Sequence, residues 1–237
     1  MAPEGLPDPL RVALAFAGIL DRLGVPYVTA GSFASSVHGE PRSTDDVDLV
    51  ADLRATHAAP LLSALHGEWY VSPEAVRNAI ARGGGGGASF NAIHLASSVK
   101  VDVFVVGDDA FDSHRVARGQ SVPVGSGPGA VLRIDTAEYT VVRKLEWFRR
   151  GGETSDRQWR DVLGILRTQG TRLDRADVTR WAERVGVADL LARAQPGERE
   201  QARGAGQLHH ADRLLGRRHG GVSLEAHRVD VGRGISG

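Results

Sequence analysis

The sequence predicts an α/β fold followed by a small helical subdomain, and three observations lead to that prediction. Residues 1–134 alternate short apolar, β-branched runs with segments of helical period, which is typical of a sheet covered by helices. Residues 135–195 carry helical periods alone, which predicts a helical subdomain. Residues 196–237 are rich in glycine, arginine and histidine without a sustained period. We expect this tail to be disordered because it offers little apolar surface to bury.

Helices and strands are expected to alternate through the first half. Pro9 and Gly24 suit the start and end of the first helix, and Ser72 with Pro73 suits the start of a later one. The expected helices cover residues 8–24, 35–38, 54–67 and 72–82. The expected strands cover residues 25–30, 46–51, 68–72, 89–96 and 99–107. The glycine run at 83–87 predicts a flexible loop.

Two N-cap patterns open the predicted helices of the second half. Asp135 and Glu138 have capping-box spacing at the start of a helix over 135–152. Ser155 and Gln158 have the same spacing before a helix over 154–170, and one or two short helices are expected within 175–194. The predicted domains are therefore an α/β core at 1–134, a helical subdomain at 135–195 and the tail at 196–237.

The composition excludes several classes of function. Lysine plus arginine and aspartate plus glutamate both number 29, so the net charge is zero and no overall field attracts nucleic acid or anionic membrane. The absence of cysteine excludes disulfides, thiol catalysis and zinc–thiolate sites. No apolar run approaches the ~18 residues of a membrane span, and the first residues lack a signal pattern. We expect a cytoplasmic protein without a membrane partner.

Three acids and a Gly-Ser pair stand out because of where they fall. Asp46 and Asp48 point to the same face of a predicted strand, since residues two apart share a face. Asp102 lies among valines in a later strand, where a carboxylate needs a partner or a metal ion. Gly31-Ser32 follows a strand and precedes a short helix, which suits the close approach of a phosphate. Carboxylates in this arrangement predict a Mg²⁺ site that is completed by substrate phosphates.

These residues, in this order, resemble the DNA polymerase beta-like nucleotidyltransferase superfamily: Gly31-Ser32, thirteen residues, Asp46-Val47-Asp48, and then Asp102 between two hydrophobic residues. The string GSFASSVHGEPRSTDDVDL is similar to the small bacterial members around AbiEii-type toxins and minimal nucleotidyltransferases. The resemblance covers residues 10–195 and implies a mixed-sheet nucleotidyltransferase core. It implies Asp46 and Asp48 as ligands of Mg²⁺ or Mn²⁺. It also implies Asp102 as a third metal ligand that helps to activate the attacking hydroxyl, and Gly31 and Ser32 as the turn that holds the triphosphate.

Four further residues are candidates for nucleotide contact. Arg42 and Thr44 precede the acidic strand, where we expect the Arg42 guanidinium to pair with phosphate oxygens. The alternative, which is compatible with that role, is that Arg42 neutralises Asp45 or Asp46. The resemblance to the AbiEii-type group implies that Lys144 touches the nucleotide and that Asp161 orients it. The alternative is that both are solvated charges on amphipathic helices.

The sequence therefore predicts a metal-dependent nucleotidyltransferase that moves a nucleoside monophosphate from a nucleoside triphosphate, such as ATP, to a hydroxyl group. The acceptor is left open between tRNA, a protein hydroxyl and a small molecule. The first alternative is an inactive nucleotide-binding module or one half of a toxin–antitoxin pair, with an antitoxin-like protein partner. The second is a plain α/β domain whose acids are structural.

Overall fold

The computed structural model describes residue 6 and residues 8–83, 88–124 and 130–195. Within these residues it contains a mixed seven-stranded sheet with the strand order β3-β4-β5-β2-β1-β7-β6. The strands are β1 (Tyr27–Thr29), β2 (Asp46–Ala51), β3 (Trp69–Val71), β4 (Ser89–His94), β5 (Lys100–Val105), β6 (Gln120–Pro123) and β7 (Val131–Ile134). The pairs β2/β5 and β1/β7 are parallel, and the other neighbours are antiparallel.

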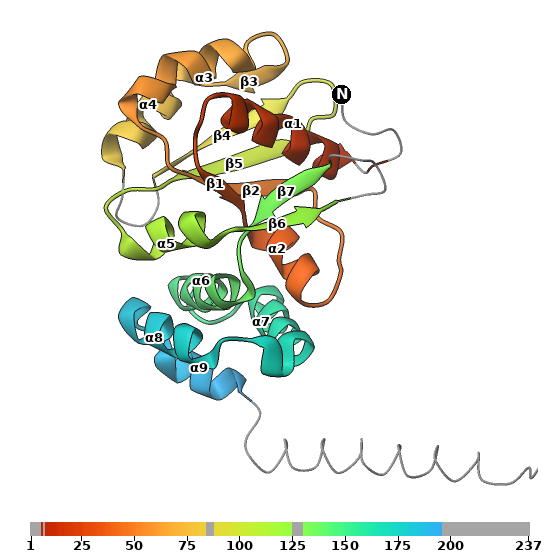
Figure 1. Cartoon of the computed structure of the whole chain (residues 1–237), viewed down its shortest axis with the longest axis vertical. Helices are drawn as coiled ribbons and strands as arrows, with labels where there is room; N and C mark the ends of the chain where they lie inside the picture. Colours follow the sequence, from red (N-terminus) through yellow and green to blue (C-terminus); the bar gives the residue numbers. More distant parts are fainter. Residues whose placement is uncertain (1–5, 7, 84–87, 125–129, 196–237) are drawn as a thin grey trace, which may run out of the picture. The chain divides into compact units, whose positions relative to one another are not determined.

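The helices divide between the two faces of the sheet. Those within the first part of the chain are α1 (Asp8–Arg22), α2 (Gly31–His38), α3 (Ala58–Leu65), α4 (Pro73–Arg82) and α5 (Ala110–Arg118), with the 3₁₀ turn η1 (Ala55–His57). Those after the sheet are α6 (Ala137–Arg150), α7 (Asp156–Gln169), α8 (Arg175–Val185) and α9 (Ala188–Ala194), with η2 (Gly170–Arg172). Figure 1 shows α1, α3 and α4 on one side of the sheet and α6 to α9 on the other.

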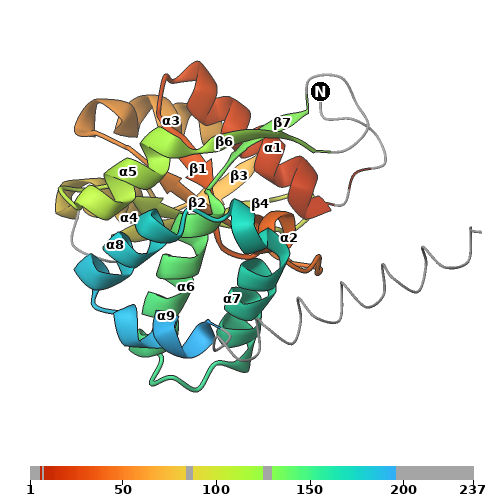
Figure 2. The same cartoon turned by 60° about the horizontal axis from the view of Figure 1, so that its bottom comes forward.

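Three hydrophobic clusters of the described residues form the core, and the smallest joins β1 and β2 to α5. The first joins the inner face of the sheet to α1, α3 and α4, and includes Val47 and Leu49 of β2 and Val101 of β5. The second lies among α6 to α9 and includes Leu145 and Trp181. The helix α2 connects the two parts, because it packs against β2 and also against α6 and α7. Figure 2 shows α6, α7, α8 and α9 grouped below the sheet.

The sheet leaves one face of β2 and β5 without this apolar cover at their amino-terminal ends. Alternate residues of β2 point away from the first core, and so do alternate residues of β5. On this face lie Asp46, Asp48 and Val50 from β2, and Lys100, Asp102 and Phe104 from β5. The strand pair therefore carries one apolar face and one face that is charged at one end.

Much of the predicted α/β and helical arrangement is confirmed. The strand at 46–51 has the predicted bounds, and Ser72 caps α4 with Pro73 in its first turn, as expected. The helix α2 begins at Gly31, four residues earlier than predicted. Sequence reasoning missed α5, β6 and β7 altogether. The predicted tail and most of the glycine run at 83–87 lie outside the described residues. Within the described residues no helix has both the length and the apolar character that a membrane crossing requires.

Candidate active site

The predicted acids share one face of the sheet. Asp48 lies directly opposite Asp102 in the parallel pairing of β2 with β5, and Asp46 lies opposite Lys100. Lys100 thus places a positive charge among the three carboxylates, and its Nζ lies 2.7 Å from Asp102 Oδ2. The hydrogen bond to Asp102, together with the neighbouring charges of Asp46 and Asp48, raises the pKa of Lys100.

Asp102 is held on both oxygens. Asn91 of β4, its partner across the sheet, donates from Nδ2 to Asp102 Oδ1 at 2.5 Å. The ammonium group of Lys100 takes the other oxygen. In this arrangement Asp102 has a fixed side-chain direction. Because a carboxylate has about four lone-pair sites, it can still bind a further group beside these two partners.

Asp48 is a partly buried carboxylate with other carboxylates beside it. Burial raises its pKa, and the negative charges of Asp102 and Asp46 raise it further, against the opposing charge of Lys144. The carboxylate lies against Gly31, whose φ is +56°. A Cβ at position 31 would overlap Asp48 Oδ2 and would lie 2.6 Å from Asp48 Cγ. The glycine therefore lets the acidic strand and the start of α2 approach each other.

Replacing Gly31 by alanine is expected to lower stability and to push Asp48 away from its position. Gly24 provides a matched control because its φ is +65° and a Cβ there would meet nothing within 4 Å. Gly24→Ala should cost only the left-handed backbone term, about 1–2 kcal/mol. Urea unfolding of both variants checks this expectation. Equal losses for the two would show that the Asp48 contact does not matter.

Ser32 and Arg42 join Lys144 and Asp161 in one hydrogen-bonded network. Arg42 donates from Nε and Nη2 to the two oxygens of Asp161, at 3.2 and 3.1 Å, and from Nη2 to Ser32 Oγ at 2.5 Å. Lys144 donates from Nζ to Asp161 Oδ2 at 2.7 Å and to Gln158 Oε1 at 3.1 Å. Asp161 of α7 therefore ties the start of α2 to α6.

Burial and pairing act in opposite directions on this network. Burial lowers the pKa of Lys144, although its bond to Asp161 opposes that shift. Burial alone would raise the pKa of Asp161, but the hydrogen bonds from Arg42 and Lys144 outweigh it and the pKa is lowered. Asp161 is thus ionised at neutral pH. Lys144 lies close enough to Asp48 to influence its charge, which connects the network to the acidic face.

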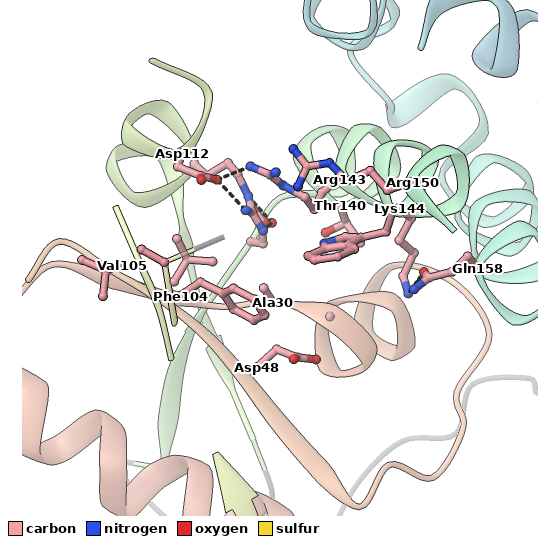
Figure 3. Close-up of a pocket in the computed structure, with 16 residues that line it drawn as sticks. Ala30, Asp48, Phe104, Val105, Asp112, Thr140, Arg143, Lys144, Arg150 and Gln158 are labelled. Carbon is pink, nitrogen blue, oxygen red and sulfur yellow. Dashed lines mark hydrogen bonds and ion pairs between the residues drawn. The ribbon is translucent and has the colours of Figure 1, made fainter. Parts of the chain in front are cut away.

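A cavity of about 190 Å³ opens beside Asp48 and continues between the sheet, α5 and α6. Figure 3 shows Asp48 and Phe104 on the sheet side and Lys144, Arg143 and Arg150 on the α6 side. Gly31 and Gln158 also line this cavity. The space therefore begins at the acidic face and the Gly-Ser turn, where a bound phosphate group would face both a carboxylate and the Lys144 ammonium.

The structure brings most of the candidate residues together, with one exception and one correction. Thr44 is half-buried and donates to the backbone oxygen of Asp46, outside the network. Arg42 forms an ion pair with Asp161, and its contact with phosphate and its electrostatic effect on Asp45 or Asp46 stay predictions.

The prediction that Asp135 caps the start of α6 is wrong. The helix α6 begins at Ala137 with Thr136 at the N-cap, and no side chain caps it. Asp135 is instead buried and accepts from Nε and Nη2 of Arg115, at 2.9 and 2.6 Å. The prediction for Ser155 is confirmed in part, since its side chain accepts from Gln158 N while the Gln158 side chain accepts from Lys144.

Sequence reasoning missed several residues of the site and its cavity. Lys100 and Asn91 bond to Asp102. The alternation of the strand, which puts Lys100 on the same face as Asp102, is the signal that was present for Lys100. Arg115 comes from the missed helix α5, and Arg143 from α6. Asp109, which caps α5 through a bond from Phe111 N, is the local signal that was present for that helix.

The donor chemistry of the acidic face fits a hard divalent cation. Among the described residues no three acidic or histidine side chains lie close enough together to hold one ion. However, Mg²⁺ often takes only one or two protein carboxylates and fills its shell with phosphates and water. Asp46 and Asp48 supply two carboxylates on one face. Burial first, and then the charges of Asp102 and Asp46, raise the pKa of Asp48, and a cation would compensate both effects. Asp102 lies on the same face and would keep its bonds to Lys100 and Asn91.

Comparisons with known proteins add a distant likeness. No family model matches the sequence, and no curated protein matches it. The solution structure of the antibiotic-resistance factor ANT(2'')-Ia has 14% identity, covers 86% of this chain and 97% of its own, and has a TM-score of 0.47. Its crystal structure in complex with adenylyl-2''-tobramycin has 13% identity, covers 74% and 97%, and has a TM-score of 0.48.

An antigenic nucleotidyltransferase-like protein from Paracoccidioides brasiliensis has 16% identity, covers 79% of this chain and 92% of its own, and has a TM-score of 0.46. With identities this low and TM-scores below 0.5, these likenesses decide nothing about activity. Any function proposed for the chain therefore rests on the geometry of its own site, and the AbiEii-type subgroup stays a prediction.

Proposed function

We propose that the chain is a metal-dependent nucleotidyltransferase that moves a nucleoside monophosphate from a nucleoside triphosphate to a hydroxyl group of an acceptor. One observation carries the proposal: the Asp48 carboxylate lies against Gly31, at the start of α2, beside the Ser32–Arg42–Asp161–Lys144 network. Gly31, Asp48 and Lys144 thus meet at one end of one cavity, while Arg42 and Asp161 line a second hollow. That is the pairing of charges which phosphoryl transfer requires.

Some of these residues would bind the substrate or the cation, and others would position the binding side chains. Ser32 and the free backbone N–H groups at the start of α2 would bind phosphate oxygens. Lys144 would neutralise phosphate charge, and Arg42 and Asp161 would keep Lys144 and Ser32 in place. Asp46 and Asp48 would hold the cation. When bound, Mg²⁺ or Mn²⁺ would polarise the α-phosphate and neutralise charge on the triphosphate.

The proposed transfer needs no covalent intermediate between the nucleotide and the protein. The acceptor oxygen bonds to the α-phosphorus, and the bond from that phosphorus to the bridging oxygen breaks, which releases pyrophosphate. The hydroxyl proton must go to a base, and Asp102 is the candidate on this face. Asp102 would accept that proton on a lone pair that its bonds to Lys100 and Asn91 leave available.

Incubation of the purified protein with Mg²⁺ and each α-³²P-labelled nucleoside triphosphate tests the proposal. Bulk tRNA, the protein itself and a metabolite extract serve as acceptors, and the Asp46→Asn/Asp48→Asn variant is the control. Label transferred by the wild type alone would support the proposal and would identify the nucleotide and the acceptor class together. No transfer to any of these acceptors would contradict it.

A nucleotide-binding module without turnover is the second candidate, and the state of Asp102 favours it. Both oxygens of that acid accept from the protein's own groups, and the Lys100 ammonium already neutralises its charge, so the acid has a structural role that does not require turnover. Isothermal titration with Mg²⁺ and each triphosphate, beside product analysis, separates the two candidates. Tight, metal-dependent binding without pyrophosphate release would support the binding module.

A further inference from the structure

Lysine is rare in this chain, and both of its lysines lie at the candidate site. Lys100 and Lys144 are two of the 29 lysine and arginine residues, and all the others are arginine. Lys144 belongs to the network around Asp161, whereas Lys100 lies on the acidic face of the sheet. An ammonium is a compact point charge with three donors, while a guanidinium is a planar fork. Lysine is therefore the basic residue whose charge is closer in size and shape to a metal ion.

Lys100 completes a two-by-two arrangement of side chains with the three acids. It lies opposite Asp46 across the parallel strands and two residues before Asp102 on the same face. Adjacent strands lie about 4.8 Å apart, and residues two apart along a strand lie about 6.6 Å apart. The Lys100 Nζ is 2.7 Å from Asp102 Oδ2, and the charges of Asp46 and Asp48 also act on it. The ammonium is thus a neighbour of all three carboxylates.

The formal charges on this face match a single divalent cation. Asp46, Asp48 and Asp102 carry three negative charges and Lys100 carries one positive charge, so two negative charges remain. One divalent cation neutralises them, and a second would leave the face with an excess of positive charge. The negative charge of a triphosphate would face Lys144 as well as the cation. Its neutralisation therefore does not require a second cation on the acids.

Asp102 stands apart from the pair formed by Asp46 and Asp48. Among the described residues no three acidic or histidine side chains are near enough to one another to share one ion. Asp102 instead has a positive partner of its own in Lys100, and Asn91 fixes its other oxygen. An ammonium can neutralise and orient a carboxylate, but it cannot polarise an oxygen by coordination as a metal ion does. Lys100 therefore supplies charge at Asp102 without Lewis acidity.

We propose that Lys100 takes the place of a second divalent cation beside Asp102, so that the acidic face binds one cation per nucleotide, on Asp46 and Asp48. This assignment rests on the proposed function. Lys100 acts through Asp102 and is a positioning residue. It fixes the direction of that carboxylate and neutralises the charge that would otherwise attract a second ion. The acceptor hydroxyl then meets Asp102 without a metal ion between them.

The number of Mn²⁺ ions in a complex with a nucleotide that cannot react tests the assignment. The α,β-methylene analogues of the four nucleoside triphosphates serve as probes, because their bridging carbon prevents the release of pyrophosphate. Native mass spectrometry counts the Mn²⁺ ions in each protein–nucleotide complex. Electron paramagnetic resonance shows whether two ions lie ~3.5–4 Å apart, because such ions couple magnetically. The wild type should bind one Mn²⁺ and show no coupled spectrum.

Lys100→Met nearly keeps the length of the side chain and removes its charge. This variant should bind a second Mn²⁺ at least about tenfold more tightly than the wild type does, with a coupled spectrum. Lys100→Arg keeps the charge and should bind one ion. Arg54→Met is the matched control, because Arg54 forms an ion pair of 2.8 Å with Asp52, beyond the end of β2, and its loss should change nothing. Circular dichroism and melting show that each variant folds.

One Mn²⁺ in both the wild type and Lys100→Met would overturn the assignment. Two coupled ions in the wild type would overturn it as well, even if label transfer is observed. A second ion in Lys100→Met but not in Lys100→Arg would support it even if no transfer occurs, so the two proposals fail separately. A wild type that binds the nucleotide without Mn²⁺ would contradict the cation site of the proposed function, and the assignment with it.

Discussion

Asp48→Asn is expected to abolish nucleotide transfer, by on the order of 10³-fold or more, and to make the protein more stable at neutral pH. Transfer fails because the variant loses the carboxylate beside Gly31 that would hold the cation. Without the cation, the charge at the α-phosphate is not neutralised. Stability rises because burial, Asp102 and Asp46 raise the pKa of Asp48 in the folded protein. An acid with a raised folded pKa favours folding at low pH, and that contribution is lost as the pH rises through the folded pKa. Asparagine removes this cost.

Melting curves of the wild type and Asp48→Asn between pH 3 and pH 8, beside the transfer assay, check both parts. The gap between the two proteins should close as the pH falls below the pKa of Asp48. Asp45→Asn is the control, because Asp45 is exposed and directly precedes β2. Transfer that survives in Asp48→Asn would refute the catalytic part, and a variant less stable than the wild type at neutral pH would refute the electrostatic part.

Arg115→Met is expected to cost about 3–5 kcal/mol of folding free energy, because it leaves Asp135 buried without its charged partner. Burial raises the pKa of Asp135, and the positive charge of Arg115 is the largest effect that opposes this shift. Loss of Arg115 therefore leaves the buried carboxylate without a partner of comparable strength. Urea unfolding measures the loss. Arg11→Met is the control, since Arg11 pairs with Asp8 in a half-exposed pair, and exposed pairs contribute about 1 kcal/mol or less.

The double variant Arg115→Met/Asp135→Leu separates charge from packing. If the loss comes from an unpaired buried charge, removal of both charges should restore most of the stability. If the double variant is as unstable as Arg115→Met, the guanidinium acts mainly through its contacts with Asp112 and the Phe111 ring. A loss below about 1 kcal/mol in the single variant would mean that water in the cavity hydrates Asp135.

The acidic strand could be predicted to the residue because its signal is local. Val47 and Leu49 alternate with Asp46 and Asp48, and that period fixes both the strand and the two faces. The helix α5 was missed because its only buried apolar residues are Phe111 and Val116, which make no clear period.

The network around the acids could be proposed from a family resemblance, whereas residue spacing alone does not predict it. Arg42 and Asp161 lie 119 residues apart, and their bidentate pair depends on how α7 packs against α2. At Asp135 a local sequence pattern was present, but the prediction made from it was wrong. Its capping-box spacing with Glu138 is a sound local pattern, but a buried guanidinium twenty residues earlier took the carboxylate instead.

The helix α6 carries two stripes with different tasks. Val141, Leu145 and Phe148 belong to the helical core, while Thr140, Arg143, Lys144 and Trp147 line the cavity. Because the stripes lie on different sides of one helix, a substitution at Trp147 reshapes the cavity without removing a side chain of the helical core. Arg143 differs, because its Cζ lies 4.8 Å from the centroid of the Phe111 ring in that core. Changes of the cavity wall at Trp147 are therefore separable from changes of the helical core. A lineage of such proteins can diversify what it recognises by altering this wall while the same scaffold continues to fold.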